Sequence, residues 1–434
     1  MDDPGSTLVR RGRPFRDTTL FANVSDQDWN DWRWQARSCI QDLGTLEQIF
    51  RLTPEERQGA IATQDQFQLS IPPYYALLAD PDDPSCPVRM QAIPHVAEAQ
   101  KLPTSLRDPL GEDDAMPVPG LVHRYPDRVL LLINNMCSMY CRYCTRKRLT
   151  GEDNETMPRA DFERVLSYLR ATPQVRDVLI SGGDPLNISD RRLDEILGAL
   201  RAIPSIEIIR MGTRMPVVMP QRITPELCAV LRKHHPFWVN THFNHPKELT
   251  PEAIDACARL ADAGIPLGNQ TVLLRGVNSS ALLLKDLFHR LVRARVRPYY
   301  LFQCDPAEGL EHFRTPVAKG VEIMEQLQGW TSGYAIPKLV IDAPGGGGKL
   351  PFGPQYVVST GLHETVVRNF EFRTFRYPEP LERDCTVAYE DKWFAAAPPT
   401  AALEAQPPHH GSQEARASEP APAKLRIVGG TASR

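Results

Sequence analysis

The sequence predicts an α/β fold, a partial TIM-like (β/α)6 barrel with a helical N-terminal extension and a disordered C-terminal tail. From Tyr125 onward, short apolar runs alternate with amphipathic stretches, which is typical of repeated βα units around a mostly parallel sheet. Polar and glycine residues follow the apolar runs, as they do at the mouth of a parallel barrel. The 434 residues also exceed the usual size of one compact domain, which favours additions at both ends.

Four regions are predicted along the chain. They are a helical extension and linker at 1–110, the partial barrel at 111–335, a lysine loop and C-terminal segment at 336–394, and the tail at 395–434. In the extension, Ser25 and Thr53 are predicted to cap helices. The tryptophans that follow Ser25 are expected in the core or at a subunit interface. The tail is a mixture of Pro, Ala, Ser and Glu that cannot bury enough apolar area to fold.

The elements of the barrel can be placed by residue range. Strands are expected over 129–133, 178–181, 206–211, 238–242, 267–274 and 299–303. Helices are expected over 162–169, 192–200 and 253–260. The polar clusters that follow the strands should converge, because the carboxyl ends of parallel strands form one mouth.

Composition narrows the class of function. The formal net charge of -3 gives no electrostatic footprint for nucleic acid, and the longest apolar runs are far shorter than a membrane span. We therefore expect a small-molecule substrate. The nine cysteines lack the spacing of a disulfide scaffold, and the N-terminus lacks a basic region followed by an apolar core. A cytoplasmic location is expected, where thiols stay reduced.

Three of the cysteines form a compact motif. Cys137, Cys141 and Cys144 have the spacing C-x3-C-x2-C, directly after the apolar run 129–133. Three thiolates on one short loop can hold three irons of a [4Fe-4S] cluster and leave the fourth open for chemistry. Zinc sites instead pair C-x2-C with a second pair of ligands, and core packing does not require such clustering.

A second motif places four glycines ahead of Lys349. A phosphate-binding P-loop is disfavoured, because Ala343 and Leu350 occupy positions where that loop needs glycine and Ser or Thr. A lysine on flexible backbone is suited to forming a Schiff base with a carbonyl compound.

With both motifs in one chain, the sequence resembles the lysine 2,3-aminomutase family, whose members are radical S-adenosylmethionine (SAM) enzymes that depend on pyridoxal 5'-phosphate (PLP). The resemblance rests on the strings 137–148 and 344–349 and extends from about Val24 to Arg383. It implies a radical SAM barrel and an isomerase that moves the α-amino group of an L-amino acid to carbon 3. The implied cofactors are a [4Fe-4S] cluster, SAM and PLP.

The resemblance also implies a role for each site residue. Lys349 is the catalytic lysine that holds PLP, with Arg128 at the PLP phosphate. Arg146 binds the substrate α-carboxylate, and Asp305 and Asp342 bind the far end of its side chain. The cluster ligands are Cys137, Cys141 and Cys144, and the SAM contacts are Ser181, Gly182, Gly183, Asp184, His242 and Gln270. A flavodoxin or ferredoxin is the implied electron donor, and a homodimer or homotetramer the implied assembly. Zinc is not expected, because only Cys385 lies near the C-terminus.

The two aspartates predict a basic substrate, since buried carboxylates need a counter-charge. L-lysine, giving L-β-lysine, is the first choice. L-arginine is the alternative, because two carboxylates can clamp a guanidinium and Phe302 stands where the family usually has tyrosine. Two further hypotheses stay open. One is a radical SAM enzyme without PLP, and the other is a non-catalytic iron-sulfur or PLP-binding protein.

Overall fold

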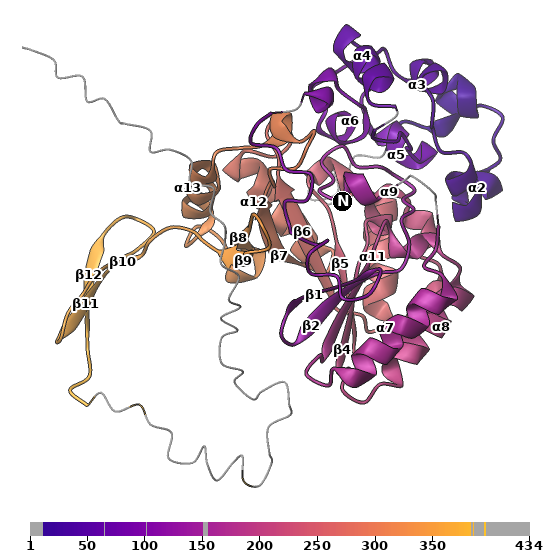
Figure 1. Cartoon of the computed structure of the whole chain (residues 1–434). Helices are drawn as coiled ribbons and strands as arrows, with labels where there is room; N and C mark the ends of the chain where they lie inside the picture. Colours follow the sequence, from indigo (N-terminus) through magenta and orange to yellow (C-terminus); the bar gives the residue numbers. More distant parts are fainter. Residues whose placement is uncertain are drawn as a thin grey trace, which may run out of the picture.

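The computed structural model describes residues 12–64, 66–100, 102–150 and 155–382, together with Cys385 and Ala395. Apart from Ala395, the predicted disordered tail at 395–434 therefore lies outside the described residues. Figure 1 shows a barrel-like sheet flanked by helices, a helical extension at one end and a separate small sheet from the C-terminal part of the chain.

A nine-stranded sheet in the order β1 to β9 forms the centre of the described part of the chain. Its strands are β1 (Leu121–Tyr125), β2 (Arg128–Leu132), β3 (Asp177–Ser181), β4 (Ile208–Gly212), β5 (Phe237–Thr241), β6 (Leu267–Leu273), β7 (Val296–Gln303), β8 (Lys338–Ala343) and β9 (Gly348–Pro351). Strands β2 to β8 pair in parallel, whereas β1 and β9 pair antiparallel at the two edges. The six predicted strands correspond to β2 to β7, and β8 adds a seventh parallel strand.

Helices follow the parallel strands and give six βα units in the described part of the chain. The helices of the barrel are α7 (Arg159–Ala171), α8 (Asp190–Arg201), α9 (Met215–Val218), α10 (Pro225–Arg232), α11 (Pro251–Asp262), α12 (Ala281–Arg293) and α13 (Val317–Leu327). In α8, Ser189 caps the N-terminus, and Leu193, Leu197 and Leu200 recur at helical spacing and are buried. Along β3, Val178 and Ile180 are buried and alternate with more exposed neighbours. This alternation is expected for a strand that faces helices on one side and the open interior of the barrel on the other. The predicted partial barrel is thus confirmed.

The extension is helical, as expected. It contains α1 (Asp26–Asn30), α2 (Trp32–Arg37), α3 (Leu43–Ile49), α4 (Pro54–Ala62), α5 (Pro73–Leu78) and α6 (Pro87–Ala92). The Ser25 hydroxyl accepts from the Asp28 amide at 3.0 Å, and Thr53 forms a full capping box with Glu56. Trp29 stacks on Phe15 with ring centroids 4.5 Å apart, so this aromatic side chain packs within the chain.

Short 3-10 helices complete the local structure. They are η2 (Phe15–Asp17), η3 (Thr19–Phe21), η4 (Val96–Ala99), η5 (Lys147–Leu149), η6 (Pro185–Asn187), η7 (Pro220–Arg222), η8 (Pro246–Glu248), η9 (Glu311–Phe313) and η10 (Gly333–Ala335). Within the described residues, no helix has the length and apolar character needed to span a bilayer.

A second sheet follows the barrel. Its antiparallel strands are β10 (Val357–Thr360), β11 (Glu364–Arg368) and β12 (Thr374–Pro378). Figure 1 shows this sheet standing away from the barrel. Near its base, Arg368 forms an ion pair with Glu325 of α13, and the ring of Phe370 packs against Trp330. The residues of β10 and β12 are exposed, so most of this sheet is not covered by the rest of the described chain.

Candidate active site

The three cysteines of the motif lie on the loop that follows β2. Cys137, Cys141 and Cys144 line one small cavity of about 50 Å³. No group of three or more His, Cys, Asp or Glu side chains in the described residues converges on a single ion. A cluster does not require that convergence, because each thiolate of a [4Fe-4S] cube binds a different iron. Three thiols around one cavity therefore fit the predicted cluster.

A buried carboxylate anchors this loop to the extension. Glu98 accepts from Arg142 Nη2 at 2.6 Å and from Lys147 Nζ at 2.8 Å. Burial alone would raise the pKa of Glu98, but the two cations more than offset it and lower the pKa to about 2. The charged residues between and after the cysteines thus fix the loop, and a buried ion pair of this kind is costly to break from one side.

The glycine segment after β3 lies directly against the cysteine loop. The amide of Gly183 donates to the Asn134 carbonyl at 2.8 Å, and the amide of Asp184 donates to the Met136 carbonyl at 2.7 Å. A Cβ on Gly182 would lie 2.2 Å from the Asn134 oxygen, and one on Gly183 would lie 2.1 Å from the Met136 oxygen. Glycine is needed here because the two backbones touch, so the predicted SAM segment and the cysteine loop form one unit.

The carboxylate of Asp184, a predicted SAM contact, accepts hydrogen bonds from other residues of the protein. It accepts from the Thr213 hydroxyl at 2.7 Å, the Arg214 amide at 2.8 Å and the Leu186 amide at 3.0 Å. Burial raises the pKa of this carboxyl group. Asp184 therefore ties the end of β3 to the end of β4, and Ser181 is the last residue of β3.

His242 and Gln270, the remaining predicted SAM contacts, are brought together at neighbouring strands. His242 directly follows β5, and Gln270 lies in β6. Burial, followed by the charges of Arg214 and Arg146, lowers the pKa of His242 to about 4. The imidazole is therefore neutral near pH 7 and can accept as well as donate a hydrogen bond.

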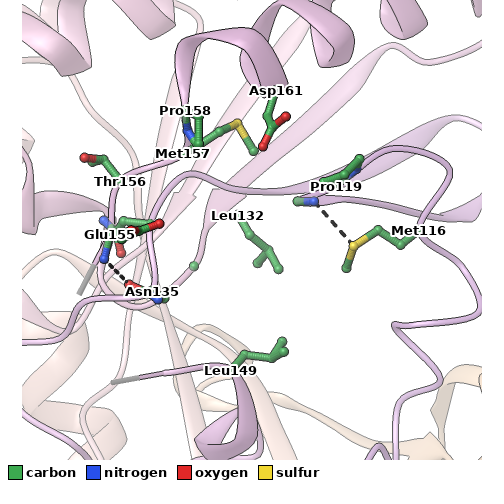
Figure 2. A pocket seen from close by; sticks show the side chains of 13 residues that line it. Met116, Pro119, Leu132, Asn135, Leu149, Glu155, Thr156, Met157, Pro158 and Asp161 are labelled. Carbon is green, nitrogen blue, oxygen red and sulfur yellow. Dashed lines mark hydrogen bonds between the residues drawn. The ribbon is translucent and has the colours of Figure 1, made fainter. Parts of the chain in front are cut away.

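A larger cavity of about 280 Å³ opens beside Gly182. Figure 2 shows Leu132 of β2 facing this space, with Met157 and Met116 around it. The segment 155–158 closes one side, where the Glu155 amide donates to Asn135 Oδ1 at 2.6 Å. The sequence did not predict this cavity, because its lining comes from separate loops.

Lys349 lies on an antiparallel hairpin and faces Asp342 across it. Its Nζ donates to both carboxylate oxygens of Asp342, at 2.8 and 2.9 Å, and lies 4.9 Å from the centre of the Phe302 ring. The Lys349 side chain is 37% exposed, so a carbonyl compound can reach its amine. In this structure the carboxylate of Asp342 is thus paired with the lysine itself.

Three of the glycines before Lys349 adopt a backbone conformation that other residues rarely take, because Gly345, Gly346 and Gly348 have φ of 70°, 78° and 83°. The amide of Gly345 donates to the Pro109 carbonyl at 3.2 Å, and a Cβ on Gly348 would lie 3.0 Å from the Tyr125 hydroxyl. That hydroxyl accepts from the Lys349 amide at 2.8 Å. Arg128 stacks on the same tyrosine ring, 3.8 Å from its centre. The two residues predicted to hold PLP are therefore linked through Tyr125.

The predicted substrate residues also gather at this end of the barrel. Arg146 forms a bidentate ion pair with Glu112, using Nε and Nη2 at 2.9 and 2.7 Å. Asp305 accepts from the Thr145 hydroxyl at 3.0 Å. Burial, followed by the charge of Asp342, raises the pKa of Asp305 to about 6. One arginine and two aspartates thus lie close enough to Lys349 and to one another for their charges to interact.

Comparison with known proteins identifies the family. A family model described as Lysine-2,3-aminomutase matches residues 324–406, and one described as Radical SAM superfamily matches residues 131–284. The L-lysine 2,3-aminomutase of Fusobacterium nucleatum is 55% identical over 375 residues, which are 86% of this chain and 88% of that protein. The L-lysine 2,3-aminomutase of Clostridium subterminale is 56% identical over 362 residues, which are 83% of this chain and 87% of that protein. The chain belongs to the lysine 2,3-aminomutase family.

Membership of the lysine 2,3-aminomutase family confirms the predicted family, the radical SAM fold and the class of enzyme, an isomerase. It implies a [4Fe-4S] cluster, SAM and an amino acid substrate. The family is not uniform, however. The Glutamate 2,3-aminomutase of Clostridioides difficile is 43% identical over 354 residues, which are 82% of this chain and 84% of that protein.

Several residues of the site in this lysine 2,3-aminomutase family member were not predicted from the sequence. Glu98 and Glu112 hold the cations between and after the cysteines, and Tyr125 joins the lysine loop to Arg128. The run Arg146-Lys-Arg148 carried a signal, because cations that become buried need acidic partners. Which acids supply them depends on tertiary structure.

Proposed function

We propose that this protein converts L-lysine to L-β-lysine by moving the α-amino group to carbon 3, with Lys349 holding PLP. The observation that carries the proposal is that Asp342 accepts a lysine ammonium through both carboxylate oxygens. That ammonium belongs to Lys349 and stands in for the charged end of a lysine substrate. An amine that holds PLP would no longer present an ammonium group to Asp342, so Asp342 and Asp305 would be available to a cation of the substrate. A glutamate side chain would instead add a third carboxylate without a counter-charge.

The residues of this chain have distinct tasks in the proposed reaction. When bound, the cluster and SAM supply the radical that removes hydrogen from carbon 3, and PLP carries the amino group. Cys137, Cys141 and Cys144 would hold the cluster, and the segment 181–184 would receive SAM. Glu112 fixes the Nε and Nη2 edge of Arg146, and we assign Nη1 to the substrate carboxylate. These fixed groups orient the substrate between its two charged ends.

Arginine is the alternative substrate, and one observation favours it. The Phe302 ring lies beneath the Lys349 ammonium, and an aromatic face binds a guanidinium at least as well. Protein reconstituted anaerobically with iron, sulfide and PLP should be assayed with SAM, dithionite as the reductant, and lysine, arginine, ornithine or glutamate in parallel. We expect lysine to react fastest. Faster turnover of arginine would make arginine the assigned substrate in place of lysine. Preference for glutamate would contradict the argument from the charges of Asp305 and Asp342.

Asp305→Asn is expected to stabilise the fold and weaken substrate binding. Because the pKa of Asp305 is raised from 3.8 to about 6, its contribution to stability is complete below pH 4 and lost as pH rises through 6. At pH 7 the ionised carboxylate therefore costs up to about 3 kcal/mol that an amide avoids. We expect the variant to melt at higher temperature at pH 8 but not at pH 4, and its KM for lysine to rise about tenfold or more.

The pH dependence of the unchanged protein tests the same assignment. Its KM for lysine should rise as pH falls below about 6, because protonation of Asp305 removes a counter-charge. Asp305→Asn should lose this dependence. Asp255→Asn, on the exposed face of α11, is the control and should change neither KM nor melting. An unchanged KM in Asp305→Asn would refute the role in substrate binding, and a lower melting temperature at pH 8 would refute the cost of the buried charge.

We further propose that the chain assembles as a homodimer or homotetramer and takes its electron from a flavodoxin or ferredoxin. Support for assembly comes from the sheet β10 to β12 and its turns, where Val358 and Tyr377 in the strands and Phe372 between β11 and β12 are 55%, 64% and 65% exposed. Exposed apolar side chains on one projecting sheet favour burial against another subunit. Analytical ultracentrifugation should give a dimer or tetramer that Phe372→Asp with Tyr377→Asp weakens. A fully active monomer would contradict the assembly.

A further inference from the structure

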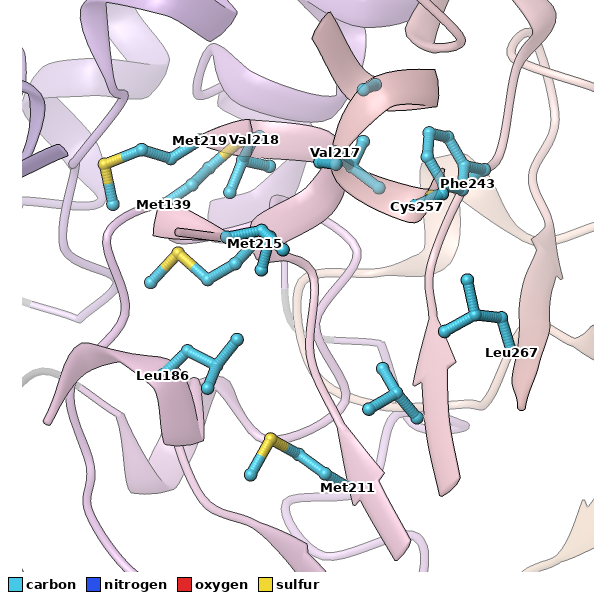
Figure 3. Packing of buried hydrophobic residues seen from close by; sticks show 14 of the residues in the cluster. Met139, Leu186, Met211, Met215, Val217, Val218, Met219, Phe243, Cys257 and Leu267 are labelled. Atoms are coloured by element: carbon cyan, nitrogen blue, oxygen red, sulfur yellow. The ribbon is translucent and has the colours of Figure 1, made fainter. Parts of the chain in front are cut away.

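Arg214 places a cation against one sulfur of the cysteine motif. It follows β4, is 7% exposed, and its Nη1 donates to Cys141 Sγ at 2.9 Å. None of the residue roles proposed for the reaction involves this arginine. Helix α9 begins at the next residue, and its four buried residues fix the backbone at Arg214. Figure 3 shows Met139 of the cysteine loop facing Met215 and Met219 in the same hydrophobic cluster.

The remainder of the guanidinium is held by four other residues of the chain. Nη2 donates to Gln91 Oε1 and to Glu248 Oε1, both at 2.7 Å, and to the Tyr75 hydroxyl at 3.1 Å. Nε donates to the His242 carbonyl at 3.2 Å. The rigid fork of arginine points its N–H groups at all these acceptors, with the two hydrogens of Nη2 shared among three of them, which a lysine ammonium cannot do. Arg214 therefore has little freedom to turn away from the sulfur.

A buried arginine can neutralise a carboxylate such as Glu248 without contacting a cysteine. Arg89 is another buried arginine with a buried carboxylate partner, Glu56, at 2.6 Å. The other hydrogen-bond acceptors of Arg89 in the described chain are backbone carbonyls, and none is a cysteine. Arg214 differs because one of its donors reaches a predicted cluster ligand.

We infer that Arg214 donates a hydrogen bond to the sulfur of Cys141 in the assembled cluster and thereby makes the cluster easier to reduce. In that reduction the cluster gains one electron from an external one-electron donor, and no bond to the protein forms or breaks. The cluster and its thiolates become one charge more negative. A hydrogen-bond donor and a cation at the ligand sulfur stabilise this added charge, and burial strengthens both effects.

The inference also gives the helical extension a function. Gln91 and Tyr75 belong to α6 and α5, so the extension helps to aim Arg214 at the sulfur. Arg214 is thus a positioning and tuning residue, not one that touches substrate. The inference rests on the cluster assignment within the proposed function.

The first test is the reduction potential of the cluster, followed by electron paramagnetic resonance during stepwise reduction with dithionite. Arg214→Lys keeps a charge for Glu248 but gives up the fork that reaches Cys141. We expect a full complement of iron and a shift of the potential to more negative values. Arg89→Lys, the matched control, should leave the potential unchanged. An unchanged potential in Arg214→Lys with full iron content would overturn the inference.

A second measurement does not depend on how well the variant assembles. Protein grown with arginine labelled at its guanidinium nitrogens should show, in pulsed paramagnetic resonance of the reduced cluster, a coupling to labelled nitrogen and to an exchangeable proton. Arg142 and Arg146 carry the label too, but their guanidinium groups bind Glu98 and Glu112. Absence of the coupling in the unchanged protein would overturn the role of Arg214. Failure to bind iron at all would instead refute the cluster assignment.

Discussion

Lys349→Ala is expected to lose PLP binding and to lower amino migration by about a thousandfold or more, while iron content stays unchanged. The amine is the group proposed to bind the PLP carbonyl, and the other lysine of the hairpin, Lys338, lies at the opposite end of β8 from Asp342. The side chain lies on the exposed edge strand β9, so its removal should disturb the core little. Absorbance of bound PLP, release of β-lysine and iron analysis measure the three outcomes.

Two control variants separate the reactive amine from its charge. Lys349→Arg keeps a cation for Asp342 but lacks a nucleophilic amine, so it should also lose PLP. Lys338→Ala, on the exposed start of β8, removes a lysine from the same hairpin and should retain PLP and activity. In Lys349→Ala alone, the pKa of Asp305 should rise further, because the lysine charge that lowers it is gone. Retention of PLP in both Lys349 variants would contradict the assignment.

Alanine at Cys137, Cys141 or Cys144 is expected to abolish radical formation. Each thiolate is proposed to hold one iron, so loss of one ligand should lower iron and sulfide content and remove the resonance signal of the reduced cluster. Burial raises the pKa of the Cys137 and Cys144 thiols, so cluster assembly must displace their protons and should weaken as pH falls.

A neighbouring thiol provides the control for the cysteine variants. Cys39 comes from the extension, and its Sγ lies 3.5 Å from the carbonyl oxygen of Ser138 on the same loop, outside the motif. Cys39→Ser should therefore keep iron, signal and activity. An active enzyme lacking all three motif cysteines would refute the cluster assignment. An equal loss of iron, signal and activity in Cys39→Ser would mean that the variants disturb the fold of the loop and do not report on iron ligation.

The parts of the site that could be predicted from sequence are those encoded by local spacing. The cysteine spacing, the glycine run before Lys349 and the alternation of apolar runs each depend on residues close together in the chain. The cap at Thr53 was predictable for the same reason, since Glu56 is three residues away.

The partnerships that hold the site together could not be predicted, because they join distant segments. Arg146 and Glu112 are 34 residues apart, Arg142 and Glu98 are 44 apart, and Arg214 and Cys141 are 73 apart. Only the fold decides which acid meets which base. Likewise, the sequence marked Asp342 as a strand-end carboxylate, but its pairing with Lys349 appears only in the register of β8 and β9.

That register has a genetic consequence. Successive residues of a strand point to opposite faces, so Lys349 meets Asp342 only while the connection from Ala343 to Gly348 keeps its length. Loss of a single glycine codon from this run would shift the pairing by one place and turn the amine to the other face of the hairpin. The encoded protein would still contain every reactive residue and the whole barrel. Such a deletion would nevertheless be a null allele, while many substitutions elsewhere in the same hairpin would pass unnoticed.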